Sequence, residues 1–339
     1  MGIKEIAKKA NVSVTTVSLA LNGRKGVSEK TRELISRIAQ EEGYRVPSDR
    51  EIATTDNGII LFAQLTRNGK ILNKDQHHFI LEYINGIQSQ LASTGYTFEM
   101  ISDTVLQIDL LIDRINKKCV KGVIILGTEL QEDDIIAFSE LNAPFVVIDT
   151  YFNSIKAHFI SMNNIQGMFQ IIKECREIGH TSFAMITSSI RTGNITMRER
   201  GFHLALQAYG ISETYPLLSV QPGFLGAYED MNRYLDTKPN LPSLLFCFND
   251  IAAYGIIKAL RHHGIGVPQE ISVVGFDDIS MTTMMDPQLS TVKVANHMIG
   301  RKATSALIEL IDGGNPEEYT TELVSTSFIL RDSVRRLND

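Results

Sequence analysis

Residues 3–35, IKEIAKKANVSVTTVSLALNGRKGVSEKTRELI, decide the N-terminal fold. Asn11 suits a sharp left-handed turn, and Ser13 and Ser28 are suited to cap the helices that follow them. Two helices joined by so short a turn form a helix-turn-helix, whose second helix enters the major groove of duplex DNA. Apolar residues recur at helical spacing in three segments, namely Ile3, Ile6, Ala7 and Ala10, then Val17, Ala20 and Leu21, then Leu34, Ile35, Ile38 and Ala39.

Two spaced blocks in this stretch resemble the headpiece of the lactose-repressor-type (LacI/GalR) family of transcriptional regulators. They are Val12-Ser13-x-x-Thr16-Val17-Ser18-x-x-Leu21-Asn22 and Val27-Ser28-x-x-Thr31-Arg32. Both blocks are in register and lie at the extreme N-terminus, so the match is far more specific than a helix-turn-helix pattern alone. The resemblance implies a partner, double-stranded DNA.

Length and charge divide the chain into a basic head and an acidic body. At 339 residues, the chain is too long for one small core. Residues 1–50 contain ten Lys and Arg against six Asp and Glu, whereas the remainder contains 23 against 33. A small basic unit attached to a larger acidic one is typical of a DNA-binding head on another domain.

The chain gives no sign of a metal site, a cofactor or a membrane segment. The three cysteines, Cys119, Cys175 and Cys247, are widely spaced among apolar residues, which indicates packed thiols of a reducing compartment. No apolar run is long enough to span a membrane, and the N-terminus is a charged helix without a signal-peptide core. We therefore expect a cytoplasmic protein with no cofactor.

From Gly58 onward, short apolar runs alternate with amphipathic stretches. This alternation predicts an α/β protein with parallel sheets covered by helices. The rhythm falters near 150–162, which suggests two lobes. The runs are 59–65, 96–102, 122–127, 145–149, 183–187, 244–248 and 271–276, and the helical stretches are 79–94, 107–118, 133–141, 165–178, 197–209, 228–236 and 251–263.

The same family resemblance extends over the body. The matching stretches are Asn249-Asp250-x-x-Ala253-x-Gly255, the run from Pro268 to Asp278, and Leu330-Arg331-x-Ser333. It implies a two-lobed, periplasmic-binding-protein-like core of parallel sheets behind a three-helix headpiece. We expect a DNA-binding domain over 1–46, a linker over 47–57 and an effector-binding and dimerisation core over 58–339. The first lobe would hold about 58–160 and 292–324, and the second about 161–291 and 325–339.

Polar residues follow several of the predicted strands and indicate a ligand site. In open parallel sheets, ligands bind beyond the carboxyl ends of the strands. Carboxylates accept hydrogen bonds and arginine donates several, which suits a neutral polyhydroxylated ligand such as a sugar. Arg198, at the start of a helix, opposes the helix dipole, so a purely structural role is less natural for it. By resemblance, the effector-contacting positions are Asp149, Arg198, Asp250 and Asp277, and Asn249 joins the predicted ligand site because it follows a predicted strand.

The family resemblance also assigns the DNA contacts. Base contacts fall on Val14, Thr15 and Leu19, of which Leu19 offers only an apolar contact, for instance to a thymine methyl group. Phosphate contacts fix the register of the headpiece without reading sequence. They fall on Ser13, Thr16, Ser18, Asn22, Ser28, Thr31 and Tyr44.

The linker departs from the family pattern. Members usually carry Pro-Asn-x-x-Ala-Arg-x-Leu here, which folds into a hinge helix whose leucine wedges into the minor groove. This chain has Val46-Pro47-Ser48-Asp49-Arg50-Glu51-Ile52-Ala53-Thr54-Thr55-Asp56-Asn57. Its three acids against one arginine disfavour contact with phosphates. We expect a flexible or differently folded linker at least as readily as a minor-groove wedge.

These features favour a regulator, expected to be a repressor, that binds a pseudo-palindromic operator as a homodimer and responds to a small-molecule effector. A sugar is the favoured effector, and a nucleoside or purine is the alternative. Only six residues follow Ser333, so we expect a dimer rather than a tetramer. A periplasmic-type sugar-binding protein is a second hypothesis. An enzyme is disfavoured because neither a phosphate-binding loop nor a nucleophile elbow is present.

Overall fold

The computed structural model describes residues 3–10, 12–21, 27–41, 57–72, 77–211, 217–315 and 318–338. The chain divides into two compact units, one of Met1–Asp56 with the short segment Ala92–Gly95, and the other of Asn57–Leu91 and Tyr96–Asp339. The predicted linker covers 47–57, and all of it except Asn57 lies outside the described residues. Each unit is described separately below.

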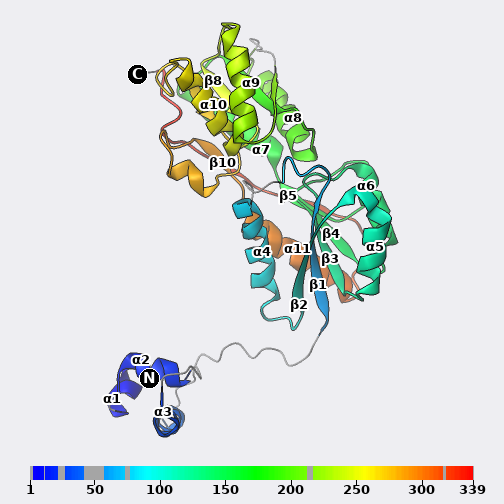
Figure 1. Cartoon of the computed structure of the whole chain (residues 1–339), viewed down its shortest axis with the longest axis vertical. Helices are drawn as coiled ribbons and strands as arrows, with labels where there is room; N and C mark the ends of the chain where they lie inside the picture. Colours follow the sequence, from blue (N-terminus) through cyan, green and yellow to red (C-terminus); the bar gives the residue numbers. More distant parts are fainter. Residues whose placement is uncertain are drawn as a thin grey trace. The chain divides into compact units, whose positions relative to one another are not determined.

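The N-terminal unit contains three helices, α1 (Ile3–Lys9), α2 (Val14–Leu21) and α3 (Glu29–Glu41) (Figure 1). They enclose a small apolar core that includes Ile6, Val17 and Ile35, each fully buried. Because all three helices contribute to this core, the helical spacing in the sequence is also the packing pattern. Leu34, which was expected in the same stripe, is instead 36% exposed.

Ser13 and Ser28 precede α2 and α3 and cap them, as the sequence predicted. The backbone N–H of Thr16 donates to Ser13 Oγ at 3.0 Å, and that of Thr31 donates to Ser28 Oγ at 3.3 Å. Each hydroxyl thus satisfies one of the free amide groups at a helix start. The Arg32 guanidinium donates to the Ala20 carbonyl at 2.8 Å and so ties α3 to the end of α2.

The second unit holds two parallel sheets with helices on both faces (Figure 1). The first lobe is built on six strands in the order β11-β5-β4-β3-β1-β2. Helices α4 (His77–Leu91) and α11 (Asn296–Ile311) cover one face, and α5 (Ile108–Lys117) and α6 (Glu132–Ala137) cover the other. Its strands are β1 (Ile59–Thr66), β2 (Thr97–Thr104), β3 (Gly122–Leu126), β4 (Phe145–Ile148), β5 (Phe159–Met162) and β11 (Thr321–Val324).

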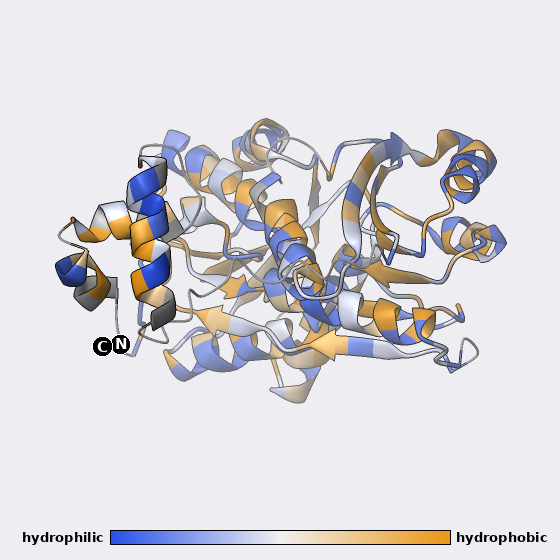
Figure 2. Cartoon of the chain, turned by 90° about the horizontal axis from the view of Figure 1, so that it is seen from below, coloured by the Kyte–Doolittle hydropathy of each residue, from blue (hydrophilic) through white to orange (hydrophobic). Residues whose placement is uncertain are grey.

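The second lobe has four strands in the order β7-β6-β8-β9. Helices α7 (Asn164–Glu177) and α8 (Gly193–Ala208) pack together, as do α9 (Phe224–Asp236) and α10 (Asp250–His262). Its strands are β6 (Phe183–Ser188), β7 (Leu218–Val220), β8 (Leu244–Cys247) and β9 (Ser272–Val274). In Figure 2 much of the strand surface is orange and the helices are banded, as expected for sheets with buried faces.

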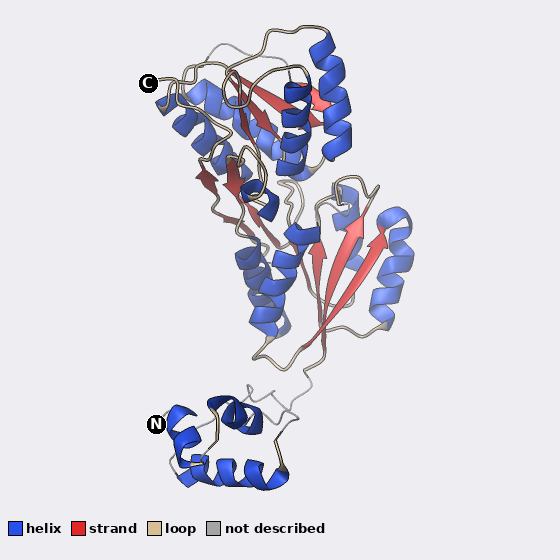
Figure 3. Ribbon diagram, turned by 60° about the vertical axis from the view of Figure 1, so that its left-hand side comes forward, coloured by secondary structure: helices blue, strands red, loops and turns tan. Residues whose placement is uncertain are grey.

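The chain crosses between the lobes more than once. β5 lies in the first sheet and leads directly into α7 of the second lobe. A two-stranded antiparallel ribbon of β10 (Thr291–Lys293) and β12 (Ser327–Ile329) accompanies the later crossings (Figure 3). The tail then joins the second lobe, where the Val273 amide donates to the Ser333 carbonyl at 2.9 Å.

Close helix packing holds the first lobe together. α4 crosses α11 at two glycines: a Cβ at Gly86 would overlap the His297 carbonyl oxygen, and one at Gly300 would overlap the Tyr83 carbonyl oxygen. Glycine is required at both positions because the two backbones touch there.

The sequence missed several short strands and misplaced some side chains. β5 lies within 150–162, where the apolar rhythm was expected to break. α6 ends at Ala137 and continues only as a 3-10 turn over Phe138–Glu140. Cys119, expected to be packed, is exposed, whereas Cys175 and Cys247 are buried. Among the described residues, no helix is long and apolar enough to cross a bilayer.

Candidate functional site

The start of α2 presents part of the predicted DNA-reading surface. Val14, a predicted base contact, is 42% exposed although it is apolar. Ser13 and Ser28 are exposed, and Thr16 and Thr31 are half-buried. The side chains of Thr15, Ser18 and Leu19, and the whole of Asn22 and Tyr44, lie outside the described residues. Their DNA contacts therefore stay predictions.

A cavity lies between the two lobes, and residues from both lobes line it. Four of the five predicted effector contacts meet here, namely Asp149, Arg198, Asn249 and Asp277. We call this space the interlobe cavity. The remaining lining residues are Ile71, Leu72, Phe79, Thr128, Thr192, Asn194, Ile195 and Phe248. Its volume of about 40 Å³ holds a few water molecules, so a sugar requires its walls to move apart.

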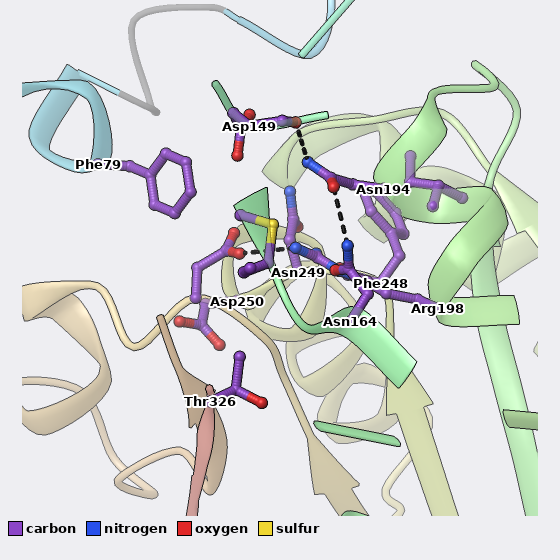
Figure 4. A network of polar contacts seen from close by, with 12 residues as sticks. Phe79, Asp149, Asn164, Asn194, Arg198, Phe248, Asn249, Asp250 and Thr326 are labelled. Atoms are coloured by element: carbon purple, nitrogen blue, oxygen red, sulfur yellow. Dashed lines mark hydrogen bonds and ion pairs between the residues drawn. The ribbon is translucent and has the colours of Figure 1, made fainter. Parts of the chain in front are cut away.

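A chain of side-chain hydrogen bonds crosses from one lobe to the other (Figure 4). Asn194 Nδ2 donates to the Asp149 carbonyl at 2.6 Å, and Asn164 Nδ2 donates to Asn194 Oδ1 at 2.8 Å. Arg198 Nε donates to Asn164 Oδ1 at 2.9 Å, and another guanidinium nitrogen donates to Asp277 Oδ1 at 3.2 Å. This relay joins the backbone carbonyl of Asp149 in the first lobe to the carboxylate of Asp277 in the second, through groups that are all buried.

Asp149 comes directly after β4 and has a positive φ of 65°. Its carboxylate accepts from the Tyr83 hydroxyl at 2.8 Å and from the Thr128 hydroxyl. Burial raises the pKa of Asp149, although these two hydroxyls and Arg198 oppose the rise. The sequence missed Tyr83 because it occupies an apolar stripe of α4. Its hydroxyl group was the available signal, since a buried tyrosine oxygen needs a partner.

Arg198 is held by three hydrogen-bond acceptors and one aromatic ring. It donates to Asn164, to Asp277 and, at 2.5 Å, to the Phe248 carbonyl, and its guanidinium carbon lies 3.6 Å from the centre of the Phe276 ring. Burial raises the pKa of Asp277 to about 7, against the lowering effect of Arg198. Asp277 also has a φ of 114°, a strained value for a residue with a side chain.

Asp250 is the predicted effector contact that the structure places elsewhere. It is fully buried and does not line the interlobe cavity. Thr291 Oγ1 donates to its Oδ1 at 2.5 Å, and the Ile279 amide donates to its Oδ2 at 3.0 Å. Burial raises its pKa well above the ordinary value, and the nearby Asp277 adds to the rise. Asp250 therefore joins α10 to β10 and to the loop after β9.

Asp278, also at the end of a predicted strand, belongs to a separate contact. Its Oδ1 accepts from Arg331 at 2.6 Å and from the Thr282 hydroxyl at 3.1 Å. Asn249 caps α10, because its Oδ1 accepts from the Ala252 amide at 2.8 Å. The amide nitrogen of Asn249 is left to face the interlobe cavity.

Glu129 fixes one wall of the interlobe cavity, and the sequence gave no sign of this role. It is 2% exposed, and its carboxylate accepts five backbone N–H groups of the loop after β1. The amides of residues 67, 68 and 69 donate to Oε2 at 2.9–3.0 Å, and those of residues 71 and 72 donate to Oε1 at 2.8–2.9 Å. Burial pushes the pKa of Glu129 upward, but the loop amides outweigh burial and lower it.

A second cavity adjoins the first. It has a volume of about 380 Å³ and shares Phe79 and Asp277 with the interlobe cavity. Figure 4 shows the Phe79 ring across from Arg198. Asn296, which also lines this second cavity, is buried and its Oδ1 has no partner among the described residues.

Comparison with known proteins identifies both units. Residues 2–47 match the model of bacterial regulatory proteins of the lacI family, and residues 172–334 match a periplasmic binding protein-like domain. The N-terminal unit is a lacI-family DNA-binding domain, and the core is periplasmic-binding-protein-like. The protein is a DNA-binding transcriptional regulator with an effector-binding core. Among the described residues, no cluster of three or more His, Cys, Asp or Glu side chains is placed to hold a metal ion.

Curated relatives match this protein along nearly its whole length. The HTH-type transcriptional repressor PurR of Haemophilus influenzae is 27% identical over 349 residues, 99% of each chain. The HTH-type transcriptional repressor CytR of Escherichia coli is 28% identical over 340 residues, 99% of this chain and 96% of the relative. A crystal structure of the lac repressor dimer bound to operator and the anti-inducer ONPF matches 98% of each chain, with 21% identity and a TM-score of 0.72.

Proposed function

We propose that this protein is a repressor that binds a pseudo-palindromic operator as a homodimer and is gated by a neutral, hydroxyl-rich small molecule, with a sugar favoured. One observation carries the effector class. Asp277 Oδ2 and Asn249 Nδ2, both in the wall of the interlobe cavity, have no hydrogen-bond partner among the described residues. An acceptor and a donor left open in one wall suit a ligand whose hydroxyl groups both donate and accept.

The charges of the lining favour a neutral ligand. Two carboxylates, Asp149 and Asp277, face the cavity against one guanidinium, that of Arg198, which already pairs with Asp277. A phosphorylated sugar would therefore meet two carboxyl groups, and the lining residues offer it no cation besides Arg198. This argument favours sugars over phosphosugars.

Phe79 and Phe248 supply the observation that favours the second candidate, a nucleoside. Both side chains line the interlobe cavity. A flat ring would stack on either of them, while the ribose hydroxyls would reach the open polar atoms. A sugar can also use an aromatic face, so the rings do not displace the first candidate.

Gating would act through the bond between Asn194 and the Asp149 carbonyl. This bond links the second lobe directly to the first. A ligand that enters between these groups replaces their hydrogen bond with its own contacts to each of them. The protein then binds the ligand with different affinity when the lobes are closed and when they are open. Such a difference in affinity is the free energy available to shift the lobes.

A thermal-shift screen tests the effector proposal. Sugars, phosphosugars, nucleosides and purines are each added to the full-length protein, and a ligand that binds the native state raises the melting temperature. Asp277→Asn should reduce the shift, because the amide removes one acceptor. The matched control is Asp113→Asn, at an exposed position of α5. A shift produced only by phosphosugars, or one untouched by Asp277→Asn, contradicts the proposed chemistry.

Operator binding is tested separately by fluorescence anisotropy. Thr15→Ala should reduce discrimination between operator and random DNA while leaving salt-dependent non-specific binding unchanged. Ser36→Ala, at an exposed position of α3, is the control. An equal fall on both DNAs would show that Thr15 does not read bases.

The dimer is tested by sedimentation. Leu81 on α4 and Met298 on α11 are each 50% exposed, and Met100 on the edge strand β2 is 44% exposed. A second copy of the chain would cover such apolar surface. A monomer or a stable tetramer at operator-binding concentrations contradicts this part of the proposal.

A further inference from the structure

The first lobe contains another cavity, which shares no lining residue with the interlobe cavity. Its volume is about 620 Å³. It lies where β4 and β5 begin and α11 ends, at the opposite end of these strands from Asp149. We call it the amino-end cavity. Most of its wall is apolar and includes Ile136, Leu141, Phe145, Ile155, Leu310 and Tyr319.

A buried polar atom in this wall lacks a partner. His158 is 8% exposed, and its Nδ1 lies 3.4 Å from the Thr320 hydroxyl oxygen. Its Nε2 is buried and has no hydrogen-bond partner among the described residues. Unpaired buried polar atoms are rare in native proteins because each one costs free energy. With the Thr320 hydroxyl donating to Nδ1, Nε2 carries the hydrogen and can donate to a ligand.

The rim of the amino-end cavity combines apolar surface with one cation. Ile136 is 53% exposed and Tyr319 is 46% exposed, and the Tyr319 ring lies 5.4 Å from that of His158. Lys156 lines the cavity and is exposed, and no ion pair of the described residues includes it. The wall therefore offers an apolar surface with two aromatic rings, one buried hydrogen-bond donor and one positive charge.

We propose that the amino-end cavity is a second small-molecule site, which takes an organic acid with a largely apolar, ring-containing body. The body lies against Phe145 and Tyr319, and the acid group lies between His158 Nε2 and the Lys156 ammonium. The volume is in the range of small-molecule sites. A small molecule fits better than a protein chain, because His158 Nε2 is buried and is reached only by a group that enters the cavity.

The probe for the test is 8-anilinonaphthalene-1-sulfonate, an aromatic body with a single anionic group. Its fluorescence is titrated against the full-length protein. We expect one saturable site per chain. Ile136→Asp and Lys156→Glu should each weaken binding by at least about tenfold, because each places a carboxylate beside the bound anion. Both positions are exposed, so folding is expected to survive, and circular dichroism checks this.

Two control variants make the titration decisive. Leu106→Asp changes a residue that is 78% exposed, after β2, and Asp277→Asn changes the interlobe cavity. Neither should alter the binding of the probe. Binding that ignores Ile136→Asp and Lys156→Glu, or that falls equally with either control, overturns the proposal. The proposal is also overturned if Ile136→Asp changes self-association in sedimentation but leaves probe binding unchanged. The rim around Ile136 would then be an interface between copies of the chain.

Discussion

The contact between Glu129 and the loop after β1 yields the sharpest prediction. In Glu129→Gln, one carboxylate oxygen becomes an NH₂ group while the size of the side chain is kept. The three amides that donate to Oε2, those of residues 67 to 69, would then face a donor instead of an acceptor. The loop that carries Ile71 and Leu72 into the interlobe cavity should lose its anchor.

The magnitude follows from the bonds that are lost. A hydrogen bond to a charged group contributes roughly 1.5–3 kcal/mol, and such losses are not fully additive. Loss of two to three of these bonds should destabilise the closed loop by roughly 3–5 kcal/mol. Besides Glu129, the loop is held by the Arg67–Asp134 pair and by the buried side chains of Ile71 and Leu72, so we expect the opening to be local. Amide exchange over residues 67–72 should then accelerate roughly 10²- to 4 × 10³-fold.

Hydrogen exchange followed by mass spectrometry measures this directly, on the full-length protein at neutral pH. Glu132→Gln is the matched control, since Glu132 is exposed on the neighbouring helix α6. The protection should also depend on pH. Because the folded pKa of Glu129 lies below its ordinary value, protection is complete above about pH 4.3 and is lost as the pH falls through the folded pKa. Unchanged exchange in Glu129→Gln would refute the assigned anchor.

Three further outcomes are expected. Arg198→Met leaves Asp277 buried without its counter-charge and should cost about 3–5 kcal/mol in urea unfolding. Burial raises the pKa of Asp277 to about 7, so this loss should be larger at pH 8 than at pH 5; equal losses would contradict the ion pair. Gly86→Ala forces a methyl group onto the His297 carbonyl and should lower the melting temperature measurably. An unchanged melting temperature would contradict the close contact between α4 and α11. Ser13→Ala removes a helix cap and should destabilise the headpiece by about 1 kcal/mol, measured by thermal unfolding of the full chain.

The fold class was predictable because its signals are local. Fully buried strands such as β3 and β8 appear as continuous apolar runs, and the helices between them show the 3.6-residue period. β7, β10 and β12 have only three residues each, too few to show a period. β11 is mostly exposed and pairs with β5, about 160 positions away in the chain. Such pairings depend on tertiary packing and leave no local mark.

For the candidate site, the sequence predicted which residues follow strand ends but not which way each side chain turns. Asp149, Asn249 and Asp277 follow strands, and parallel topology brings strand ends together, so their meeting was expected. Asp250 follows β8 in the same way, yet its carboxylate turns inward to Thr291, which comes about forty residues later. Nothing near Asp250 in the sequence distinguishes an inward carboxylate from one that faces a ligand.

Sequence reasoning did not identify Tyr83, Asn164 or Asn194 as site residues. Each has an ordinary local setting: Tyr83 lies in an apolar helix stripe, and Asn164 and Asn194 lie in the first turns of α7 and α8. Their roles arise only in the assembled fold, because their partners belong to distant segments of the chain. Local patterns predict elements well, whereas buried polar contacts depend on the assembled fold.

The way in which Glu129 holds its loop also bears on how new ligand preferences could evolve. All five donors to its carboxylate are backbone amides. The anchor is thus indifferent to which side chains the loop carries. Substitutions at Ile71 and Leu72, which face the interlobe cavity, can reshape the ligand wall while the loop keeps its course. Both side chains are also buried among apolar neighbours, so substitutions of similar size at these two positions would explore effector preference at the least cost to packing.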